Sequence, residues 1–398
     1  MKVLVLTNRI PWPTKDGGAL AMLGMLKTLR RQVEGLHLLS INASRQWVNP
    51  NKLPPFFDEL DSLTAVDVDT QVKPLGAFLN LFGNKSYNIS RFVNSKVTKA
   101  LKDLLEKEDF DVVQFDNLFV TPYLSTVRKY SNAKVVYRSH NIEFEIWDKL
   151  AQGAGNKVKK EYLKLLANRL KTYELGRLNK FDLVVPISEG DAEIYKKLGE
   201  KSLIFTSGFG IDMPQYPQVK LGDKKISFLG SLDWLPNQEG LSWFIEKVWP
   251  LVLKGNKNLI LEVAGKNPPE SIKTIKAKNY ILKGEVDSAL EFLKNSAVMV
   301  VPLISGSGIR IKIIEGLAWG LPMVSTSKGA EALGLTHGEN ILIADDPKEF
   351  AKHILELTSN KGRREQLSDK ARAMAQSNFD LNTQGEQLVE RYKKMMNA

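Results

Sequence analysis

Short apolar runs alternate with segments of helical periodicity along almost the whole chain, and this alternation starts twice. In the first half the apolar runs cover residues 2–7, 35–42, 111–116, 134–140 and 183–188. In the second half they cover residues 225–231, 259–265, 280–284, 298–304 and 322–326. Apolar, β-branched strands that alternate with helices are typical of a parallel sheet with helices on both faces. The pattern predicts an α/β chain with two Rossmann-like, doubly wound domains in series.

A segment rich in glycine and proline, TSGFGIDMPQYPQ over 206–218, separates the two series and is expected to be a linker. The length of 398 residues also exceeds the size at which one hydrophobic core keeps growing, about 250 to 300 residues. We therefore expect domains at 1–205 and 206–380, facing each other across a cleft. Residues 381–398 are expected to form a further helix that packs back on the first domain.

Composition excludes several kinds of site. The chain has no cysteine, so it has neither a disulfide framework nor a cysteine metal site. Its four histidines, His37, His140, His337 and His353, share no local metal-ligand spacing. The N-terminal apolar run is too short for a signal-peptide core, and no apolar stretch approaches ~18 residues. These features predict a cytoplasmic protein, peripheral at most to the inner face of a membrane.

Positive charge is concentrated in residues 157–180. The chain has a net charge of +11, and this segment holds eight cations and two acids. An anionic partner and a solvated helix face both remain open as interpretations. Only Tyr162 and Tyr173 interleave with the cations, whereas proteins that bind single-stranded RNA stack bases on aromatic rings. We therefore expect an anionic membrane surface rather than a nucleic acid as the partner. The apolar stretch LGAFLNLF (75–82) suits either that membrane side or a core helix.

The stretch LISGSGIRIKIIEGLAWGLP (303–322) combines glycines, two cations and one glutamate. Its loop, residues 305–308, follows an apolar strand and precedes a helix predicted to run from near 309 to about 319. A helix N-terminus offers unpaired amide groups to an anion, and glycines let a phosphate approach the backbone. Gly308, Lys312 and Glu315 are spaced four and three apart, so they are expected on one side of the helix.

This mixture of charges suits a nucleotide sugar. A glutamate accepts two ribose hydroxyls, while the side chains of Arg310 and Lys312 hold a diphosphate. A lone Lys–Glu pair on a helix surface would stabilise the helix by only a few tenths of a kcal/mol. The motif alone leaves both interpretations open.

Together with its neighbours, this stretch resembles glycosyltransferase family 4, the retaining group 1 enzymes of the GT-B fold. The strongest matching segments, in matching order and spacing, are 228–244, 261–269, 282–287 and 300–333. Weaker matches are 10–18, 137–147 and 184–195. The resemblance implies transfer of a hexose-type sugar, with retention, from a nucleoside-diphosphate sugar to a glycan or lipid-linked acceptor. It also implies a role in cell-surface polysaccharide or glycoconjugate synthesis, without a metal or other cofactor.

The resemblance also assigns donor-binding residues. The second glutamate of the family's Glu-x7-Glu motif falls on Glu315, but the first falls on Ser307, so sugar recognition is expected to use backbone amides there. The cations that commonly follow the first strand of the second domain are missing, and Arg310 and Lys312 are expected to replace them. The full set of expected donor contacts is Gly17, Gly18, Gly230, Ser231, Lys266, Gly284, Glu285, Val286, Ser307, Gly308, Ile309, Arg310, Lys312 and Glu315.

In the first half, His140 closes the strand-like run KVVYRSH, where side chains of doubly wound sheets face the ligand crevice. The resemblance implies that it lies beside the reacting end of the donor sugar, so His140 and Glu315 are the expected catalytic pair. Asn141 and Glu143 are candidates to orient the acceptor. Two other functions remain open: a sugar-nucleotide epimerase of the same fold, and a non-catalytic scaffold that binds a partner or nucleic acid.

Overall fold

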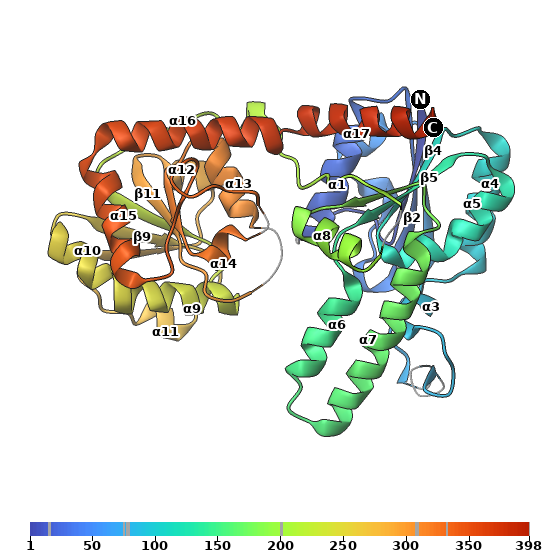
Figure 1. The fold of residues 1–398 in the computed structure, drawn as a ribbon, viewed down its shortest axis with the longest axis horizontal. Helices are drawn as coiled ribbons and strands as arrows, with labels where there is room; N and C mark the ends of the chain where they lie inside the picture. The colour runs from blue at the N-terminus through green and yellow to red at the C-terminus, as the bar shows by residue number, and fades with distance from the viewer. Residues whose placement is uncertain are drawn as a thin grey trace. The chain divides into compact units, whose positions relative to one another are not determined.

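The protein is described from a computed structural model, which covers residues 1–14, 17–74, 76, 80–199, 202–306, 310–331 and 333–397 (Figure 1). The chain divides into two compact units. Unit 1 contains Met1–Gly210 and Gln384–Ala398, and unit 2 contains Ile211–Thr383. Of the residues predicted above, Ser307, Gly308 and Ile309 lie outside the described residues, as do 75 and 77–79.

Unit 1 is built on a parallel sheet, which has seven strands among the described residues, in the order β3-β2-β1-β4-β5-β6-β7. Adjacent strands β4 and β5 pair Asp116 with Arg138, so their carboxyl ends meet at one edge of the sheet. The strands are β1 (Lys2–Thr7), β2 (Gly35–Ala43), β3 (Ser62–Val68), β4 (Val112–Asp116), β5 (Lys134–Ser139), β6 (Leu183–Pro186) and β7 (Leu203–Ile204).

Helices cover both faces of this sheet because successive strand residues point to opposite sides. In β1, Leu4 and Leu6 join one buried cluster, while Val3 and Val5 join another. The helices are α1 (Gly17–Arg30), α3 (Tyr87–Ser90), α4 (Ser95–Lys107), α5 (Leu124–Tyr130), α6 (Glu143–Gln152), α7 (Lys157–Leu178) and α8 (Glu189–Lys197). Short 3-10 turns occupy Ser44–Gln46, Pro50–Lys52, Pro55–Glu59 and Leu118–Tyr123.

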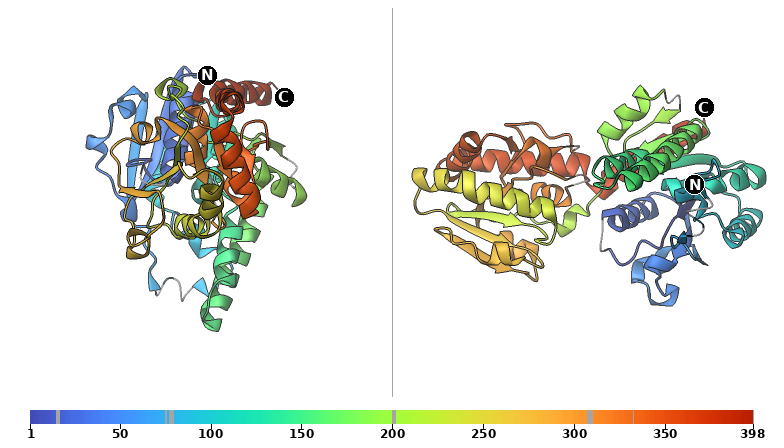
Figure 2. Two further views of the ribbon diagram at one scale, coloured as in Figure 1. Left: turned by 90° about the vertical axis from the view of Figure 1, so that its left-hand side faces the viewer. Right: turned by 90° about the horizontal axis from the view of Figure 1, so that it is seen from below.

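The last helix, α17 (Leu381–Met396), runs alongside α1 in unit 1 (Figures 1 and 2). Its side chains Leu388, Val389, Tyr392 and Met395 are buried in the same cluster as Val3 and Val5 of β1. The C-terminal segment is therefore part of the core of unit 1.

Helices α6 and α7 form a hairpin that projects beyond the sheet of unit 1 (Figures 1 and 2). Arg169 in α7 donates hydrogen bonds to the backbone oxygens of Asn80 (2.7 Å) and Leu81 (3.0 Å). The turn at 80–82 is thereby fastened to the hairpin. No described helix of the chain is both long and apolar enough to cross a membrane.

Unit 2 has a second parallel sheet, six-stranded among its described residues, in the order β10-β9-β8-β11-β12-β13. The strands are β8 (Lys225–Leu229), β9 (Ile260–Ala264), β10 (Tyr280–Gly284), β11 (Ser296–Val301), β12 (Met323–Ser325) and β13 (Leu342–Ile343). The helices are α9 (Leu235–Trp243), α10 (Trp249–Gly255), α11 (Glu270–Lys273), α12 (Ala289–Leu293), α13 (Ile311–Ala318), α14 (Ser327–Ala330), α15 (Pro347–Ser359) and α16 (Lys361–Asn378). A 3-10 turn (Met213–Gln215) and a π-helical turn (Phe244–Val248) complete the unit.

Two parallel, helix-covered sheets confirm the predicted fold class. The sequence reading did not identify β3, β7 and β13, two of which are only two residues long. The helix predicted from near 309 begins at Ile311 and ends at Ala318, so Arg310 occupies its N-cap position.

Candidate active site

The ammonium group of Lys312, from the first turn of α13, lies at the carboxyl end of β8. Its Nζ donates hydrogen bonds to Asn237 Oδ1 (2.8 Å) and to the backbone oxygen of Leu229 (3.3 Å), the last residue of β8. The same atom lies 5.0 Å from the centre of the Phe228 ring. A side chain at the next residue, Gly230, would come within 3.1 Å of Nζ. The cation therefore stands beside the loop after β8, where the sequence itself supplies none.

Two cations gather at this end of unit 2. Arg310 is 4% exposed, and its guanidinium lies 5.7 Å from the centre of the Trp234 ring. Burial lowers the pKa of Arg310. Burial, and secondarily the charge of Arg310, lower the pKa of Lys312 to about 7. Crowding two partly desolvated cations is unfavourable, and an anion bound between them relieves that cost.

Glu315 lies one turn further along α13 and is held by the linker segment. Tyr216 donates a hydrogen bond from its hydroxyl to Glu315 Oε1 (3.1 Å), and its ring packs against Trp319. Arg372 fixes this tyrosine by donating from Nη1 to its backbone oxygen (2.7 Å). Burial raises the pKa of Glu315, and burial together with the nearby carboxylate raises the pKa of Tyr216. The hydrogen bond from Tyr216 thus fixes Glu315 Oε1. The carboxylate can still accept hydrogen bonds from other hydroxyl groups.

The ends of β8, β9 and β10 approach each other through glycines. Gly265 donates its N–H to the oxygen of Gly284 (2.7 Å), and Gly284 has a φ of 70°. A Cβ at Gly265 would stand 1.8 Å from the oxygen of Gly230, so only glycine fits there. Beside them, Lys266 Nζ pairs with Glu285 Oε1 at 3.2 Å, and both side chains are exposed.

In unit 1, His140 directly follows β5 and contacts the residue that ends β4. His140 Nε2 forms a short hydrogen bond with Asp116 Oδ1, and Arg138 Nη1 lies 3.4 Å from the same oxygen. These three side chains are buried. Burial acts to raise the pKa of Asp116, but the charges of His140 and Arg138 outweigh it and hold that pKa below its ordinary value. Asp116 is therefore an ionised carboxylate within the core.

The acceptor candidate Glu143 begins α6 and is only 7% exposed, and burial raises its pKa to about 7. Behind it, the fully buried Glu174 accepts the backbone N–H groups of Glu143 (3.4 Å) and Phe144 (3.2 Å). Burial raises the pKa of Glu174 to about 8. Because the N-cap residue Ile142 has no polar side chain, Glu174 supplies the acceptor that the start of α6 needs.

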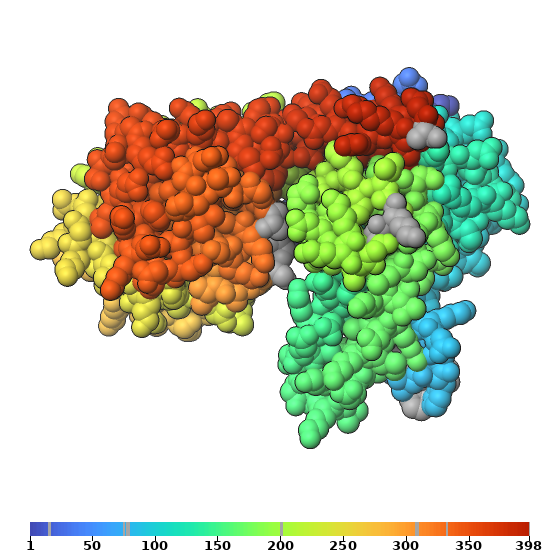
Figure 3. Space-filling view, in the orientation of Figure 1, coloured from blue at the N-terminus to red at the C-terminus, as the bar shows by residue number. Residues whose placement is uncertain are grey.

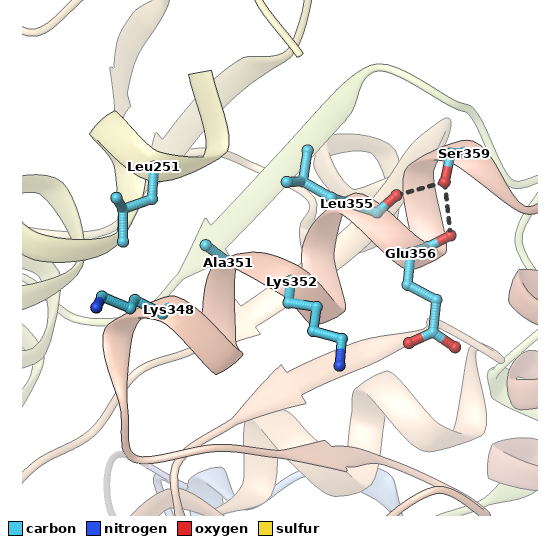
Figure 4. A pocket seen from close by; sticks show the side chains of 7 residues that line it. All are labelled: Leu251, Lys348, Ala351, Lys352, Leu355, Glu356 and Ser359. Carbon is cyan, nitrogen blue, oxygen red and sulfur yellow. Dashed lines mark hydrogen bonds between the residues drawn. The ribbon is translucent and has the colours of Figure 1, made fainter. Parts of the chain in front are cut away.

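Two hollows lie in the described surface. One, of ≈ 420 Å³, lies between α10 and α15; its lining residues are Leu251, Lys348, Ala351, Lys352, Leu355, Glu356 and Ser359 (Figure 4). In it, Ser359 Oγ already donates to the backbone oxygens of Leu355 (2.7 Å) and Glu356 (3.3 Å). The other, of ≈ 430 Å³, lies between α6 and α7. Among the described residues, no three acidic or histidine side chains gather as a metal site.

Comparison with known proteins identifies the family. Residues 223–360 match the model of the family described as Glycosyl transferases group 1. Sucrose-phosphate synthase from Thermosynechococcus elongatus superposes with a TM-score of 0.64 at 13% identity, over 100% of both chains. The chain therefore carries a group 1 glycosyltransferase domain. The resemblance seen in the sequence is confirmed, together with the GT-B fold.

Two further proteins are similar to this chain over nearly its whole length. Anabaena Alr3699/HepE, solved in complex with UDP and glucose, has a TM-score of 0.60 at 13% identity, covering 99% of both chains. An uncharacterized 44.6 kDa protein in the cps region of Klebsiella pneumoniae is 23% identical over an alignment of 397 positions, and the match covers 95% of this chain and 96% of that one.

Among the described residues, the structure brings the predicted donor residues of unit 2 together around the ends of β8, β9 and β10 and the start of α13; these are Gly230, Ser231, Lys266, Gly284, Glu285, Val286, Arg310, Lys312 and Glu315. Ser231 donates from Oγ to Asp233 Oδ1 (2.6 Å), and Val286 is half-buried beyond Glu285. Gly17 and Gly18 begin α1 of unit 1, and a side chain at Gly17 would meet open space. Asn141 is exposed next to His140.

Sequence reasoning missed several residues that position the predicted ones, among them Asn237, Tyr216, Arg372, Glu174 and Asp116. Three of them, Asn237, Tyr216 and Arg372, lie at least 75 residues from the side chain or backbone group that they hold. Only Asp116 carried a usable signal, because it closes a predicted strand adjacent to the one that ends at His140.

Proposed function

We propose that this group 1 glycosyltransferase is a retaining enzyme that transfers a hexose-type sugar from a nucleoside-diphosphate sugar to a glycan or lipid-linked acceptor, without a metal ion. The observation that carries the proposal is the pairing on α13 of Lys312, held at the end of β8, with the half-buried carboxylate of Glu315. Support also comes from the relative in the cps region, which favours cell-surface polysaccharide synthesis, and from HepE, whose structure holds UDP and glucose.

In this proposal Glu315 accepts the ribose hydroxyls while Tyr216 keeps its carboxylate in place. Lys312 and Arg310 bind the diphosphate and stabilise the charge that develops on it as the sugar departs. The bond between the anomeric carbon and the phosphate oxygen breaks, and a bond to the acceptor oxygen forms on the same face. The leaving phosphate oxygen takes the acceptor's proton, so the protein's task is positioning and electrostatic stabilisation. We assign His140 to the reacting end of the sugar and Asn141 and Glu143 to the acceptor.

Nucleotide binding tests the donor half of the proposal. UDP, GDP, ADP, dTDP and CMP are added in turn, and the thermal unfolding of the full chain is followed. A ligand at ~100 times its Kd should add about 2.7 kcal/mol to the free energy of unfolding. Glu315→Gln should lose that gain, while Glu270→Gln, an exposed carboxylate of the same unit, should keep it.

Product analysis tests the chemistry. The configuration at the anomeric carbon of the product, read by NMR, should match that of the donor; inversion would contradict the mechanism. A nucleotide sugar converted without any acceptor would indicate an epimerase instead. If no nucleotide stabilises the protein, the fold serves as a scaffold and the proposal fails.

We propose further that the acceptor is reached at an anionic membrane surface, through α7. The tip of the α6–α7 hairpin exposes Leu150 (53%) and Val158 (80%) beside Lys157 and Lys159, and Phe82 in the attached turn is 80% exposed. In the space-filling view the hairpin stands out from unit 1 with that turn against it (Figure 3). Apolar side chains surrounded by lysines suit the headgroup region of an anionic bilayer.

Vesicle sedimentation tests this placement. The protein should bind vesicles of phosphatidylglycerol and phosphatidylcholine, bind pure phosphatidylcholine less, and dissociate as salt is raised. Val158→Asp should weaken binding, whereas Leu198→Asp, at the exposed end of α8, should not. Equal binding by both variants would contradict a role for the hairpin tip.

A further inference from the structure

A buried chain of hydrogen bonds links the C-terminal helix to His140. Tyr392 in α17 donates from its hydroxyl to Gln114 Oε1 in β4, across 278 positions of sequence. Gln114 Nε2 donates to Asp116 Oδ2 at 3.5 Å. The other carboxylate oxygen, Oδ1, contacts His140 Nε2. Tyr392, Gln114 and Asp116 are fully buried, and His140 is 6% exposed.

This series of hydrogen bonds determines which nitrogen of His140 carries the proton. Asp116 is ionised, since its pKa is lowered, and a carboxylate can only accept hydrogen bonds. The nitrogen that faces it, Nε2, must therefore be the donor. Arg138 Nη1, 3.1 Å from the same nitrogen, shares the carboxylate and is itself a donor. In the neutral ring, Nδ1 is then the nitrogen left to accept a hydrogen bond.

The hydroxyl of Tyr392 is not needed for packing. Its neighbours on α17, Leu388, Val389 and Met395, bury apolar side chains in the same cluster, and a phenylalanine would fill the same space. A hydroxyl in such a core is unfavourable unless it is hydrogen-bonded. Burial raises the pKa of Tyr392, so its hydroxyl keeps its proton and can donate to Gln114.

We propose that Asp116 and Tyr392 are positioning residues for His140. Asp116 fixes the orientation and the Nε2–H tautomer of the ring, and Tyr392 holds Asp116 in place through Gln114. The C-terminal helix thereby sets the geometry at the end of β5. The effect on turnover rests on the proposed function, in which His140 lies at the reacting end of the donor, but the effect on the ring does not.

The test uses the full chain and compares two tyrosines. Asp116→Asn is the direct change, but it leaves the buried Arg138 without its counter-charge and endangers folding. Tyr392→Phe removes only one oxygen. The matched control is Tyr123→Phe, which deletes another buried hydroxyl of unit 1, one that donates to the backbone oxygen of Phe92 (2.6 Å).

Long-range ¹H–¹⁵N NMR of the imidazole rings is the first measurement. The chain has four histidines, so the His140 signals are assigned by their loss in His140→Gln. We expect a protonated Nε2 in the wild type, a shift of the His140 ring signals in Tyr392→Phe, and no shift in Tyr123→Phe. Where sugar transfer is measured, Tyr392→Phe should lower kcat about tenfold with the donor KM little changed, the signature of a group acting in the transition state.

The outcomes distinguish a failure of the positioning role from a failure of the proposed glycosyltransferase function. His140 signals that stay fixed in Tyr392→Phe, or a wild-type ring protonated on Nδ1 alone, would overturn the positioning role. An equal fall of kcat in both tyrosine variants, with fixed ring signals, would also overturn it, because general destabilisation would then explain the loss. A ring shift confined to Tyr392→Phe in a protein that transfers no sugar would support the positioning role and refute the proposed function.

Discussion

Binding of a nucleoside diphosphate should weaken as the pH rises above 7, because Lys312 must carry its proton to hold a phosphate. Burial places its pKa at about 7 in the ligand-free protein. A bound anion favours the charged form of Lys312 and raises its pKa, so the protein takes up a proton when the nucleotide binds. Well above pH 7, each further pH unit makes the free energy of binding about 1.36 kcal/mol less favourable, because that proton is harder to obtain. Because half of the lysines are already deprotonated at pH 7, the Kd should rise about 50-fold between pH 7 and 9 and approach a tenfold rise per unit only at the upper end. The terminal phosphate, with a pKa of about 6, is already ionised over this range.

The stability of the ligand-free protein should change in the opposite direction. In the unfolded chain Lys312 has the ordinary lysine pKa of 10.5, so between pH 7 and 10.5 the unfolded state binds more protons than the folded state. The free energy of unfolding of unit 2 should therefore rise with pH over this window, by up to about 1.36 kcal/mol per unit from this lysine. Stability that rises with pH while nucleotide affinity falls is a specific signature of a buried ammonium at the binding site.

Calorimetric titration at pH 6, 7, 8 and 9, in buffers of different ionisation enthalpy, measures both the Kd and the protons taken up. UDP is the first probe, followed by the other nucleotides. Lys312→Met should bind weakly at every pH and take up no proton, while Lys273→Met, an exposed lysine of the same unit, should behave like the wild type. Wild-type affinity that stays constant from pH 7 to 9, or the same slope in Lys312→Met, would refute the contact between this ammonium and the phosphates.

Three further changes test other contacts of the two units. Tyr216→Phe removes the hydrogen bond to Glu315, worth about 1 kcal/mol, and should weaken nucleotide binding about fivefold in the same titration while melting temperature changes little. Glu174 has a folded-state pKa raised to about 8, so its stabilising contribution is complete below its unfolded pKa of 4.5 and is lost as the pH rises through 8; Glu174→Gln should flatten that loss in chemical denaturation of unit 1. Gly265→Ala forces a methyl group against the oxygen of Gly230 and should destabilise unit 2 by at least about 1–3 kcal/mol in thermal unfolding; an unchanged melting temperature would contradict the close approach of these strand ends.

The strands that the sequence predicted are those with a continuous apolar run. β11, for example, is buried at every position, and after Ser296 all its residues are apolar, as is typical of a strand covered on both faces. β3 was missed because it lies at the edge of its sheet, where most of its residues are only half-buried. Two-residue strands such as β7 and β13 carry too little pattern to be recognised.

At the candidate site, the sequence predicted the proximity of residues that are close together along the chain. Lys312 and Glu315 are three residues apart on one helix, so their proximity follows from helical geometry. Their partners Asn237 and Tyr216 lie 75 and 99 positions away, and only the fold brings them in. Nothing in a Gly- and Pro-rich linker indicates that its tyrosine will hold the motif glutamate.

The loop after β8 lacks the cation that the family pattern places there. In the folded structure, Lys312 brings an ammonium group to the same position. β8 and β11 are neighbouring strands of one parallel sheet, so loops that follow them meet at the same edge. Lys312, which comes after β11, can therefore place its ammonium against Leu229 at the end of β8. A cation supplied from either loop should serve the same phosphate.

This equivalence can be tested by moving the charge back. Ser231 is exposed after β8, and its hydroxyl bonds only to the exposed Asp233 within the contacts described, so replacing it should cost little stability. The double variant Lys312→Met, Ser231→Lys should recover part of the nucleotide affinity lost in Lys312→Met. Because a lysine at an exposed position keeps a pKa near 10.4, the recovered binding should no longer vary between pH 7 and 9. Recovery with the wild-type pH slope, or no recovery at all, would show that the position of the ammonium after β11 is itself required.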